Sequence, residues 1–107
     1  MLDNSLYINT IRICIKAKKI SIGETMLYDI RSNKAKVVVI ALDAGEASKK
    51  KVKDKCKSFE VPCIELLTKK DLAYMFNKDI SGFAITDENL AKKFVENLNK
   101  GGICYGK

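Results

Sequence analysis

An uninterrupted apolar run marks the middle of the chain. Residues 37–42 read Val-Val-Val-Ile-Ala-Leu. A β-branched run of this kind is typical of a central strand that is covered on both faces. Shorter runs of the same character cover residues 62–66, where Pro62 takes the first position of the strand, and residues 83–86. Residues 19–22 alternate polar and apolar side chains, so we predict a short fourth strand there.

Between these runs, apolar residues recur at the three- and four-residue spacing of a helix face. In the first such segment, residues 4–18, Ile8, Ile11 and Ile15 share a face, and Asn4 or Ser5 can cap the helix. Further helices are predicted over residues 23–32, 46–59, 68–77 and 88–99. Strands that alternate with helices predict an α/β fold, a three-layer α/β/α sandwich with a small mixed sheet of about four strands.

The ends of two of these helices carry recognisable signals. Thr68 is the expected cap of the helix over residues 68–77. Gly101 and Gly102 are expected to end the last helix, and the tail from residue 103 onward is expected to be loose.

Length and charge indicate one domain with a polyanionic partner. A chain of 107 residues, 47% of them hydrophobic, has the size and the apolar content of a single domain, which we expect to span residues 1–107. The formal net charge is +7 and comes mostly from lysine, because Arg12 and Arg31 are the only arginines. Such a basic domain is expected to bind nucleic acid or an anionic membrane surface. Arginine is the usual reader of base edges, so its scarcity favours contacts with a phosphate backbone.

The sequence predicts a cytoplasmic protein without a membrane partner. The first fifteen residues contain Asp3, Asn4, Asn9 and Arg12, which interrupt the apolar core that a signal peptide requires. No stretch approaches the roughly 18–20 apolar residues of a membrane span.

Cysteine usage points to the same compartment. The four cysteines, Cys14, Cys56, Cys63 and Cys104, show no CxxC spacing, and the chain has no histidine. Metal-ligand spacing is therefore absent, and we expect neither a metal nor a cofactor. Free thiols in a reducing cytosol are the expectation, and a Cys56–Cys63 disulfide is the alternative.

Catalysis is not expected. Without histidine, a cysteine or serine nucleophile lacks its commonest base. Asp43 and Asp87 each follow a predicted core strand, so they could meet at one edge of the sheet and hold magnesium or accept phosphate. Both are also good helix caps, which is the commoner use of aspartate after a strand. The chain has neither of the glycine-rich motifs that cradle nucleotides, so we predict a binding protein and not an enzyme.

Residues 20–28 form the first candidate binding segment. A strand ends, Gly23 permits close approach, and a helix starts at once, so free N–H groups and the positive end of the helix dipole can bind phosphate. Glu24 and Thr25 can meet base edges or 2′-hydroxyls as acceptor and donor. A structural alternative makes Gly23 a turn and Glu24 a partner of the dipole. The cations nearby in sequence are Lys18, Lys19, Arg31 and Lys34.

The helix predicted over residues 46–59 carries the densest charge. At about 100° per residue, four of its lysines fan over one outer arc and three apolar residues face inward. The lysines are Lys49, Lys50, Lys53 and Lys57, and the apolar residues are Val52, Cys56 and Phe59. The arc is either an ordinary solvated face or an auxiliary surface that steers phosphates.

Several blocks of the sequence occur in a recognisable order and spacing. They are residues 34–44 (KAKVVVIALDA), 48–57 (SKKKVKDKCK), 61–62 (VP) and 84–89 (AITDEN). Together they resemble the kink-turn-binding ribosomal protein superfamily of the L7Ae and L30e type, particularly its small stand-alone bacterial members. The similarity extends from about Ile8 to Leu98. The resemblance implies the α/β/α sandwich predicted above and an RNA partner.

The resemblance also implies where the RNA binds. In the family, RNA contacts the turn and first half of the second helix, the loop after the first core strand and the loop before the last strand. The residues here are Lys19, Gly23, Glu24, Thr25, Tyr28, Asp43, Ala44, Lys78, Asp79, Ile80 and Ser81. Family members place an apolar wedge in the last loop, and Ile80 is the candidate here. We add Arg31 to this set, since it lies on the same predicted helix.

The chain departs from the family pattern at some of these positions. Strong binders often carry Asn-Glu where this chain has Glu24 and Thr25, and a lysine where it has Tyr28. Lys18 replaces a glycine in the turn before the first strand. One lost lysine–phosphate contact weakens RNA binding modestly, and Tyr28 can compensate by stacking on a base.

The sequence therefore predicts a monomeric RNA-binding protein. Its expected target is a kink-turn or a similar structured ribosomal RNA, which it would bind as a ribosomal or ribosome-associated protein. The alternative is a protein-interaction adaptor on the same fold, with weak or non-specific RNA binding.

Overall fold

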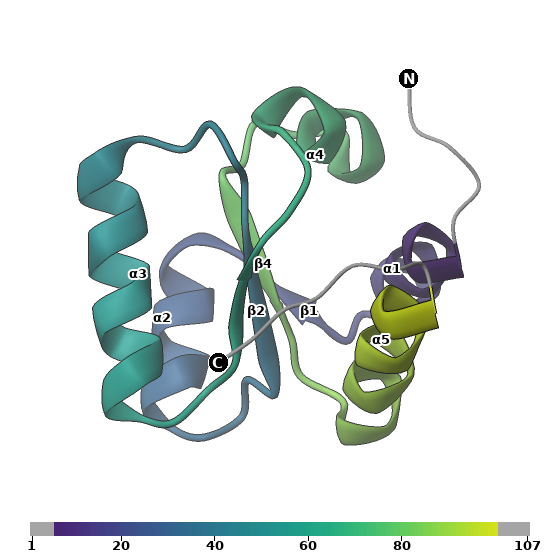
Figure 1. The fold of residues 1–107 in the computed structure, drawn as a ribbon, viewed down its shortest axis with the longest axis horizontal. Coiled ribbons are helices and arrows are strands. Elements are labelled where there is room, and N and C mark those ends of the chain that lie inside the picture. The colour runs from purple at the N-terminus through teal and green to yellow at the C-terminus, as the bar shows by residue number, and fades with distance from the viewer. Residues whose placement is uncertain (1–5, 101–107) are drawn as a thin grey trace.

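A four-stranded sheet runs through the middle of the computed structural model, which describes residues 6–100 (Figure 1). The helices are α1 (Leu6–Lys16), α2 (Gly23–Arg31), α3 (Glu46–Ser58), α4 (Lys69–Phe76) and α5 (Glu88–Lys100). The strands are β1 (Ile20–Ser21), β2 (Val37–Ile40), β3 (Cys63–Glu65) and β4 (Gly82–Ile85). Each of these elements was predicted, with ends that differ by a few residues. The predicted caps of α1 at Asn4 and Ser5, the glycines at 101 and 102 and the tail lie outside the described residues.

The sheet has the order β1-β4-β2-β3. β2 and β3 are parallel, whereas β4 is antiparallel to both β1 and β2. All four residues of β2 are buried, as expected for a strand covered on both faces. The predicted small mixed sheet is therefore confirmed.

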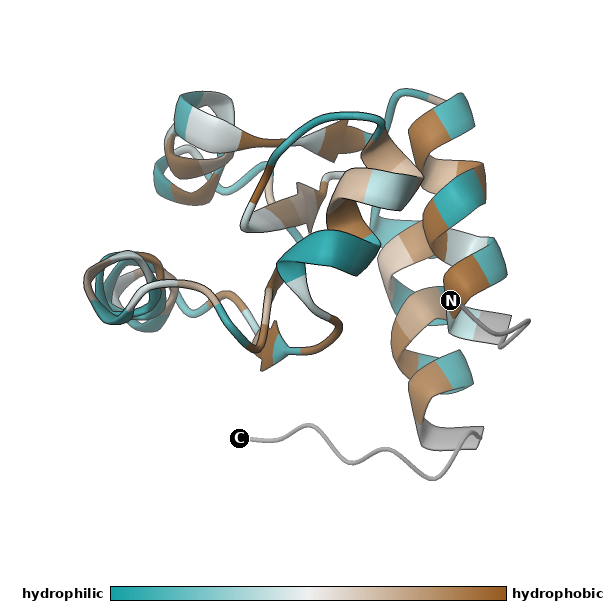
Figure 2. Cartoon of the chain, turned by 90° about the horizontal axis from the view of Figure 1, so that it is seen from above, coloured by the Kyte–Doolittle hydropathy of each residue, from teal (hydrophilic) through white to brown (hydrophobic). Residues whose placement is uncertain are grey.

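Helices cover both faces of the sheet. In Figure 1, α2 and α3 lie on one side, α1 and α5 on the other, and α4 closes one end. The view from above in Figure 2 shows α1 and α5 side by side, with hydrophobic segments in both. The predicted α/β/α sandwich is thus confirmed. No helix of residues 6–100 is long and apolar enough to cross a membrane.

Aromatic contacts join one helix to the sheet and two helices to each other. Phe83 of β4 is fully buried, and its ring lies 5.2 Å from that of Phe76, which ties α4 to the end of the sheet. Tyr7 of α1 packs in a T-shaped contact with Phe94 of α5, at 6.4 Å between ring centroids. The first of these contacts holds α4 beside the end of β4, where the candidate site lies.

Candidate functional site

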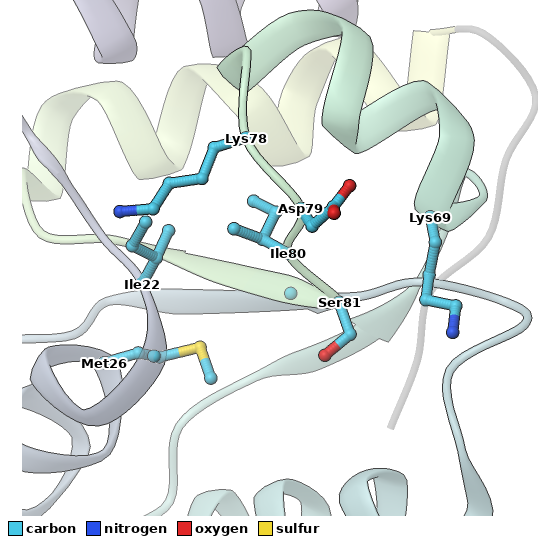
Figure 3. A pocket seen from close by; sticks show the side chains of 9 residues that line it. Ile22, Met26, Lys69, Lys78, Asp79, Ile80 and Ser81 are labelled. Atoms are coloured by element: carbon cyan, nitrogen blue, oxygen red, sulfur yellow. The ribbon is translucent and has the colours of Figure 1, made fainter.

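A hollow of about 670 Å³ lies where α2 and β4 begin. The two segments meet because β1 is antiparallel to β4, with Ser21 opposite Ala84, so the chain leaving β1 passes the chain entering β4. α4 supplies a further wall. The lining residues are Ile22, Gly23, Met26, Lys69, Lys78, Asp79, Ile80, Ser81 and Gly82 (Figure 3).

The start of α2 lies in this hollow without a side-chain cap. Its N-cap residue, Ile22, is extended (φ −136°, ψ 161°) and offers no hydrogen-bonding side chain. Gly23 follows with φ +61°, in the left-handed region that favours glycine, although a Cβ there would meet nothing within 4 Å. The left-handed backbone conformation, and not a lack of space for a side chain, is thus what favours glycine at this position. The first N–H groups of a helix lack intrahelical partners, so this end of α2 is suited to an anion.

Two lysines border an apolar floor in the hollow. Ile80 is half-buried and packs on the hydrophobic core together with Ile22. In Figure 3 the side chain of Lys78 extends over Ile22, and Lys69 stands on the opposite side of Ile80. The carboxylate of Asp79 is turned away from Lys78. The arrangement offers phosphate-binding cations beside an apolar surface on which a base can rest.

The position of Lys69 is set by hydrogen bonds at the start of α4. The predicted cap, Thr68, is confirmed: its hydroxyl accepts from the Asp71 N–H at 3.2 Å, and the Asp71 carboxylate accepts from the Thr68 N–H at 3.2 Å. Asp43, in the loop after β2, accepts from the Lys69 N–H at 2.8 Å. Leu67 precedes the cap with φ 68°, an uncommon conformation for a bulky residue. The loop after β2 and the start of α4 are therefore one connected unit beside the hollow.

The idea that Asp43 and Asp87 meet at one edge of the sheet is wrong. β2 and β4 are antiparallel, so their carboxyl ends lie at opposite edges. The Asp87 carboxylate accepts from the N–H groups of Asn89 and Leu90 and caps α5. Among the described residues, no group of three or more Asp, Glu, Cys or His side chains is arranged to hold a metal ion.

The lysine arc of α3 is smaller than the helical spacing predicts. Lys49 and Lys53 both turn to Glu65 of β3, and the Lys49 ammonium also donates to the Leu42 carbonyl at 2.7 Å. The hydrogen bond from Lys53, and after it the one from Lys49, lowers the pKa of Glu65. The Lys53–Glu65 hydrogen bond also raises the pKa of Lys53. Lys50 and Lys57 stay exposed.

The inward face of α3 also differs from the prediction at one end. Val52 and Cys56 are buried as predicted, but Phe59 is 37% exposed. Phe59 is the residue after the helix end, with φ −107° and ψ 11°, so helical spacing no longer decides its direction.

The described cysteines are free thiols, and the alternative of a Cys56–Cys63 disulfide is not what the structure shows. The Cys56 thiol nevertheless hydrogen-bonds to Cys63, and that bond, together with nearby Lys53, lowers the pKa of Cys63. The same hydrogen bond and burial raise the pKa of Cys56. Burial raises the pKa of Cys14 to about 11. Cys104 lies outside the described residues.

The sequence model of the ribosomal protein L7Ae/L30e/S12e/Gadd45 family matches residues 9–95. The chain belongs to this family. The resemblance seen in the sequence is thereby confirmed.

Two curated proteins that are similar to this chain in sequence are both named RNA-binding protein YlxQ. The one from Enterococcus faecium is 44% identical over 89 residues, which are 82% of this chain and 86% of the relative. The one from Bacillus subtilis (strain 168) is 31% identical over 86 residues, 78% of this chain and 86% of the relative.

Solved structures share the fold. A protein of unknown function from Bacillus halodurans C superposes with a TM-score of 0.83 at 19% identity, over 90% of this chain and 99% of the other. The 15.5kD RNA binding protein of Giardia lamblia gives 0.72 at 21% identity, over 89% of this chain and 84% of the other.

The hollow unites some of the residues to which the family resemblance points, and leaves others out. Gly23, Lys78, Asp79, Ile80 and Ser81 line it. The remaining residues of that set, together with Arg31, lie outside its lining; they are Lys19, Glu24, Thr25, Tyr28, Arg31, Asp43 and Ala44. Ala44 is 6% exposed, so it has almost no side-chain surface to offer.

Tyr28 and its neighbours extend the surface of α2 away from the hollow. The Tyr28 side chain is 56% exposed, and the Lys34 ammonium lies 5.9 Å from its ring centroid. Glu24, Thr25 and Arg31 are exposed on the same helix. Lys34, in the turn after α2, thus brings a cation to the Tyr28 ring.

Four lining residues are absent from the sequence prediction: Ile22, Met26, Lys69 and Gly82. Ile22 and Met26 follow an apolar spacing that indicates only core. The sequence does contain a signal that could have identified Lys69 as a site residue. Lys69 directly follows the predicted cap Thr68, and phosphates commonly bind at the start of a helix. Gly82 sits in β4 opposite Ile40, and nothing local in the sequence shows that pairing.

Proposed function

We propose that this protein binds structured RNA in the hollow between the start of α2 and the loop before β4. Both curated relatives are named RNA-binding proteins and the family is one of RNA binders, so binding and not catalysis is the activity. The net charge of +7 suits a polyanion. The target is a kink-turn or a similar bent internal loop in ribosomal RNA, bound by a monomer in the cytoplasm as a ribosomal or ribosome-associated protein.

One observation carries this proposal: an uncapped helix start and two lysines surround the half-buried Ile80. The N–H groups of α2, Lys69 and Lys78 provide phosphate contacts on several sides. Ile80 gives an unstacked base an apolar surface, and a sharply bent internal loop presents such bases. A straight duplex keeps its bases stacked and cannot use Ile80 in this way.

Side chains on the exposed rim of α2 supply selectivity. Glu24 accepts hydrogen bonds and Thr25 donates or accepts, so both can read base edges or 2′-hydroxyls next to the hollow. Tyr28 can stack on a base further along the helix.

The binding test compares a kink-turn RNA with a straight duplex of equal length in a gel-shift assay. Glu24→Ala combined with Thr25→Ala should weaken kink-turn binding about tenfold or more, since base contacts are lost. Lys78→Ala should weaken it more modestly and reduce the salt slope by about one phosphate contact. Lys50→Ala with Lys57→Ala is the matched control at moderate salt, where distant charges are screened, because both lysines are exposed on α3 away from the hollow.

Equal, weak affinity for the two RNAs would contradict the kink-turn target. A larger loss from the α3 control pair than from the α2 pair would show that the site lies on α3. A protein partner that survives nuclease treatment in a pull-down, without measurable RNA affinity, would favour the adaptor alternative.

A further inference from the structure

A second hollow lies between α1 and α4. It measures about 730 Å³, and Arg12, Ile13, Lys16, Tyr74 and Met75 are among its lining residues. None of the lining side chains is acidic. We call this hollow the α1–α4 groove.

The groove exposes side chains that add little to the fold. Tyr74 is 74% exposed and Ile13 is 48% exposed, whereas Leu72 on the same helix as Tyr74 is fully buried. α4 therefore packs through its Leu72 face and leaves the Tyr74 ring in solvent. An exposed aromatic ring beside cations is a surface suited to binding, because stacking on the ring and charge attraction act together.

The charged side chains that line the groove, Arg12 and Lys16, favour an anionic ligand. Arg12 is one of only two arginines among the twenty basic residues of the chain. A guanidinium binds phosphate through two parallel hydrogen bonds and also stacks on planar groups. Lys16, one helical turn further along α1, adds a second cation on the same side.

α4 contributes lining residues to both the groove and the first hollow. Lys69 lines the first hollow, Lys70 follows it, and Tyr74 reaches the groove; all three are exposed. Lys69 and Tyr74 are separated by only about 7 Å along the helix axis. An RNA strand leaving the first hollow along α4 would therefore pass Lys69 and Lys70 before it reached Tyr74.

We propose that the α1–α4 groove binds a short single-stranded segment of RNA that continues from the structured part held in the first hollow. Tyr74 stacks on a base, and Arg12 and Lys16 bind the flanking phosphates. The apolar floor of Ile13 and Met75 covers the ring edges of that base. This inference rests on the proposed function, since it extends the same RNA across α4.

The test compares one kink-turn RNA in two forms, blunt and with a four-nucleotide single-stranded extension at either end, by fluorescence anisotropy. The extension should raise affinity for the native protein about five- to tenfold, the effect of one stacked base with its phosphates. Tyr74→Ala should abolish that gain and leave affinity for the blunt RNA unchanged. Arg12→Ala with Lys16→Ala should do the same and lower the salt slope for the extended RNA.

Lys92→Ala with Lys93→Ala is the matched control. These lysines are exposed on α5, outside both hollows, so the pair should leave the gain from the extension intact. Far-ultraviolet circular dichroism of each variant reports folding, and Tyr74 is exposed enough that its loss should not alter the spectrum.

The outcomes separate this inference from the proposed function. If blunt RNA binds but no extension adds affinity, the inference is overturned and the proposed function stands. If blunt RNA does not bind and a single strand binds through Tyr74, the groove is upheld and the kink-turn target fails. A nuclease-resistant protein partner lost in Tyr74→Ala would assign the groove to protein and overturn the inference.

Discussion

Cys63 differs from the other described thiols in both access and charge. It is partly exposed, whereas Cys14 and Cys56 are buried. Its pKa is lowered because the Cys56 thiol donates a hydrogen bond to it and Lys53 lies nearby, while burial raises the pKa of Cys14 to about 11. The thiolate is the reactive form of cysteine, so a lowered pKa and access act in the same direction.

Cys63 should therefore be alkylated first. Iodoacetamide at pH 7.5, followed by peptide mass spectrometry, should modify Cys63 well before Cys14 and Cys56. Cys56→Ala removes the donated hydrogen bond, raises the pKa of Cys63 and should slow its alkylation severalfold. Faster labelling of Cys14 than of Cys63 would contradict this account.

Residue-level departures from the family pattern are not all departures in structure. Lys18, at the position where the sequence resemblance led us to expect glycine, has a φ of 59°, in the left-handed region that favours glycine. The sequence shows the replacement, but the retained backbone shape follows from the surrounding turn, where the Lys19 N–H donates to the Cys14 carbonyl at 2.9 Å.

At the scale of elements, hydrophobic spacing predicts every helix and strand of the described chain. It does not predict where the backbone of a strand exchanges its hydrogen-bonding partners in the sheet for partners in loops. The apolar run over residues 37–42 predicts one strand, while β2 ends at Ile40. The Ala41 N–H then bonds to Ser81 and the Leu42 N–H to Leu67, so the chain leaves the sheet towards two different loops. The apolar character of residues 37–42 alone therefore does not predict that the strand ends at Ile40.

Strand direction is a second limit on what the sequence can predict. Asp43 and Asp87 have the same local context, each after a buried strand, and only the antiparallel pairing of β2 with β4 separates them. The same pairing decides the candidate site, because β1 and β4 must be antiparallel for Gly23 to meet Ile80. Gly23 at the start of α2 could be proposed from sequence, whereas Met26, Lys69 and Gly82 required the folded arrangement.

The close approach of β4 to β2 gives a prediction for one glycine. A Cβ on Gly82 would lie 2.8 Å from the Val39 carbonyl oxygen, which is backbone and cannot rotate away. Gly82→Ala should destabilise the fold by roughly 1–3 kcal/mol, the range typical of overpacking. Thermal denaturation should show a midpoint several degrees lower.

Gly45→Ala is the matched control for that measurement. A Cβ at Gly45 would meet nothing within 4 Å, and its φ of −60° suits any residue. Gly45 is the N-cap of α3, where alanine is less favourable than glycine, so the midpoint should fall slightly but by much less than for Gly82→Ala. An equal drop for both variants would mean that the contact with Val39 is not the cause.

At the scale of the whole molecule, the positive charge is widely distributed, but little of it lies at the candidate site. Lys69 and Lys78 line the hollow, Lys49 and Lys53 pair with Glu65, and Lys50, Lys51 and Lys57 of α3 are exposed. Distant charges attract a polyanion before contact and are screened by salt within about 10 Å at 0.1 M ionic strength. The association rate and the dissociation rate should thus depend on different lysines.

Charge reversal on α3 tests this division. Lys50→Glu with Lys57→Glu should slow association with RNA severalfold at low salt and leave the dissociation rate nearly unchanged. The difference from the native protein should shrink as salt rises, because screening removes the steering. Stopped-flow fluorescence at several salt concentrations measures both rates, and a faster dissociation would instead place α3 in the interface.

The antiparallel meeting of β1 and β4 has a consequence for how the activity arises during synthesis. One wall of the hollow, residues 22–26, is made early, and the opposite wall, residues 78–82, is made more than fifty residues later. A nascent chain that has emerged only through α3 presents the start of α2 with nothing facing it. The proposed RNA site is therefore completed in one late step, when β4 enters between β1 and β2.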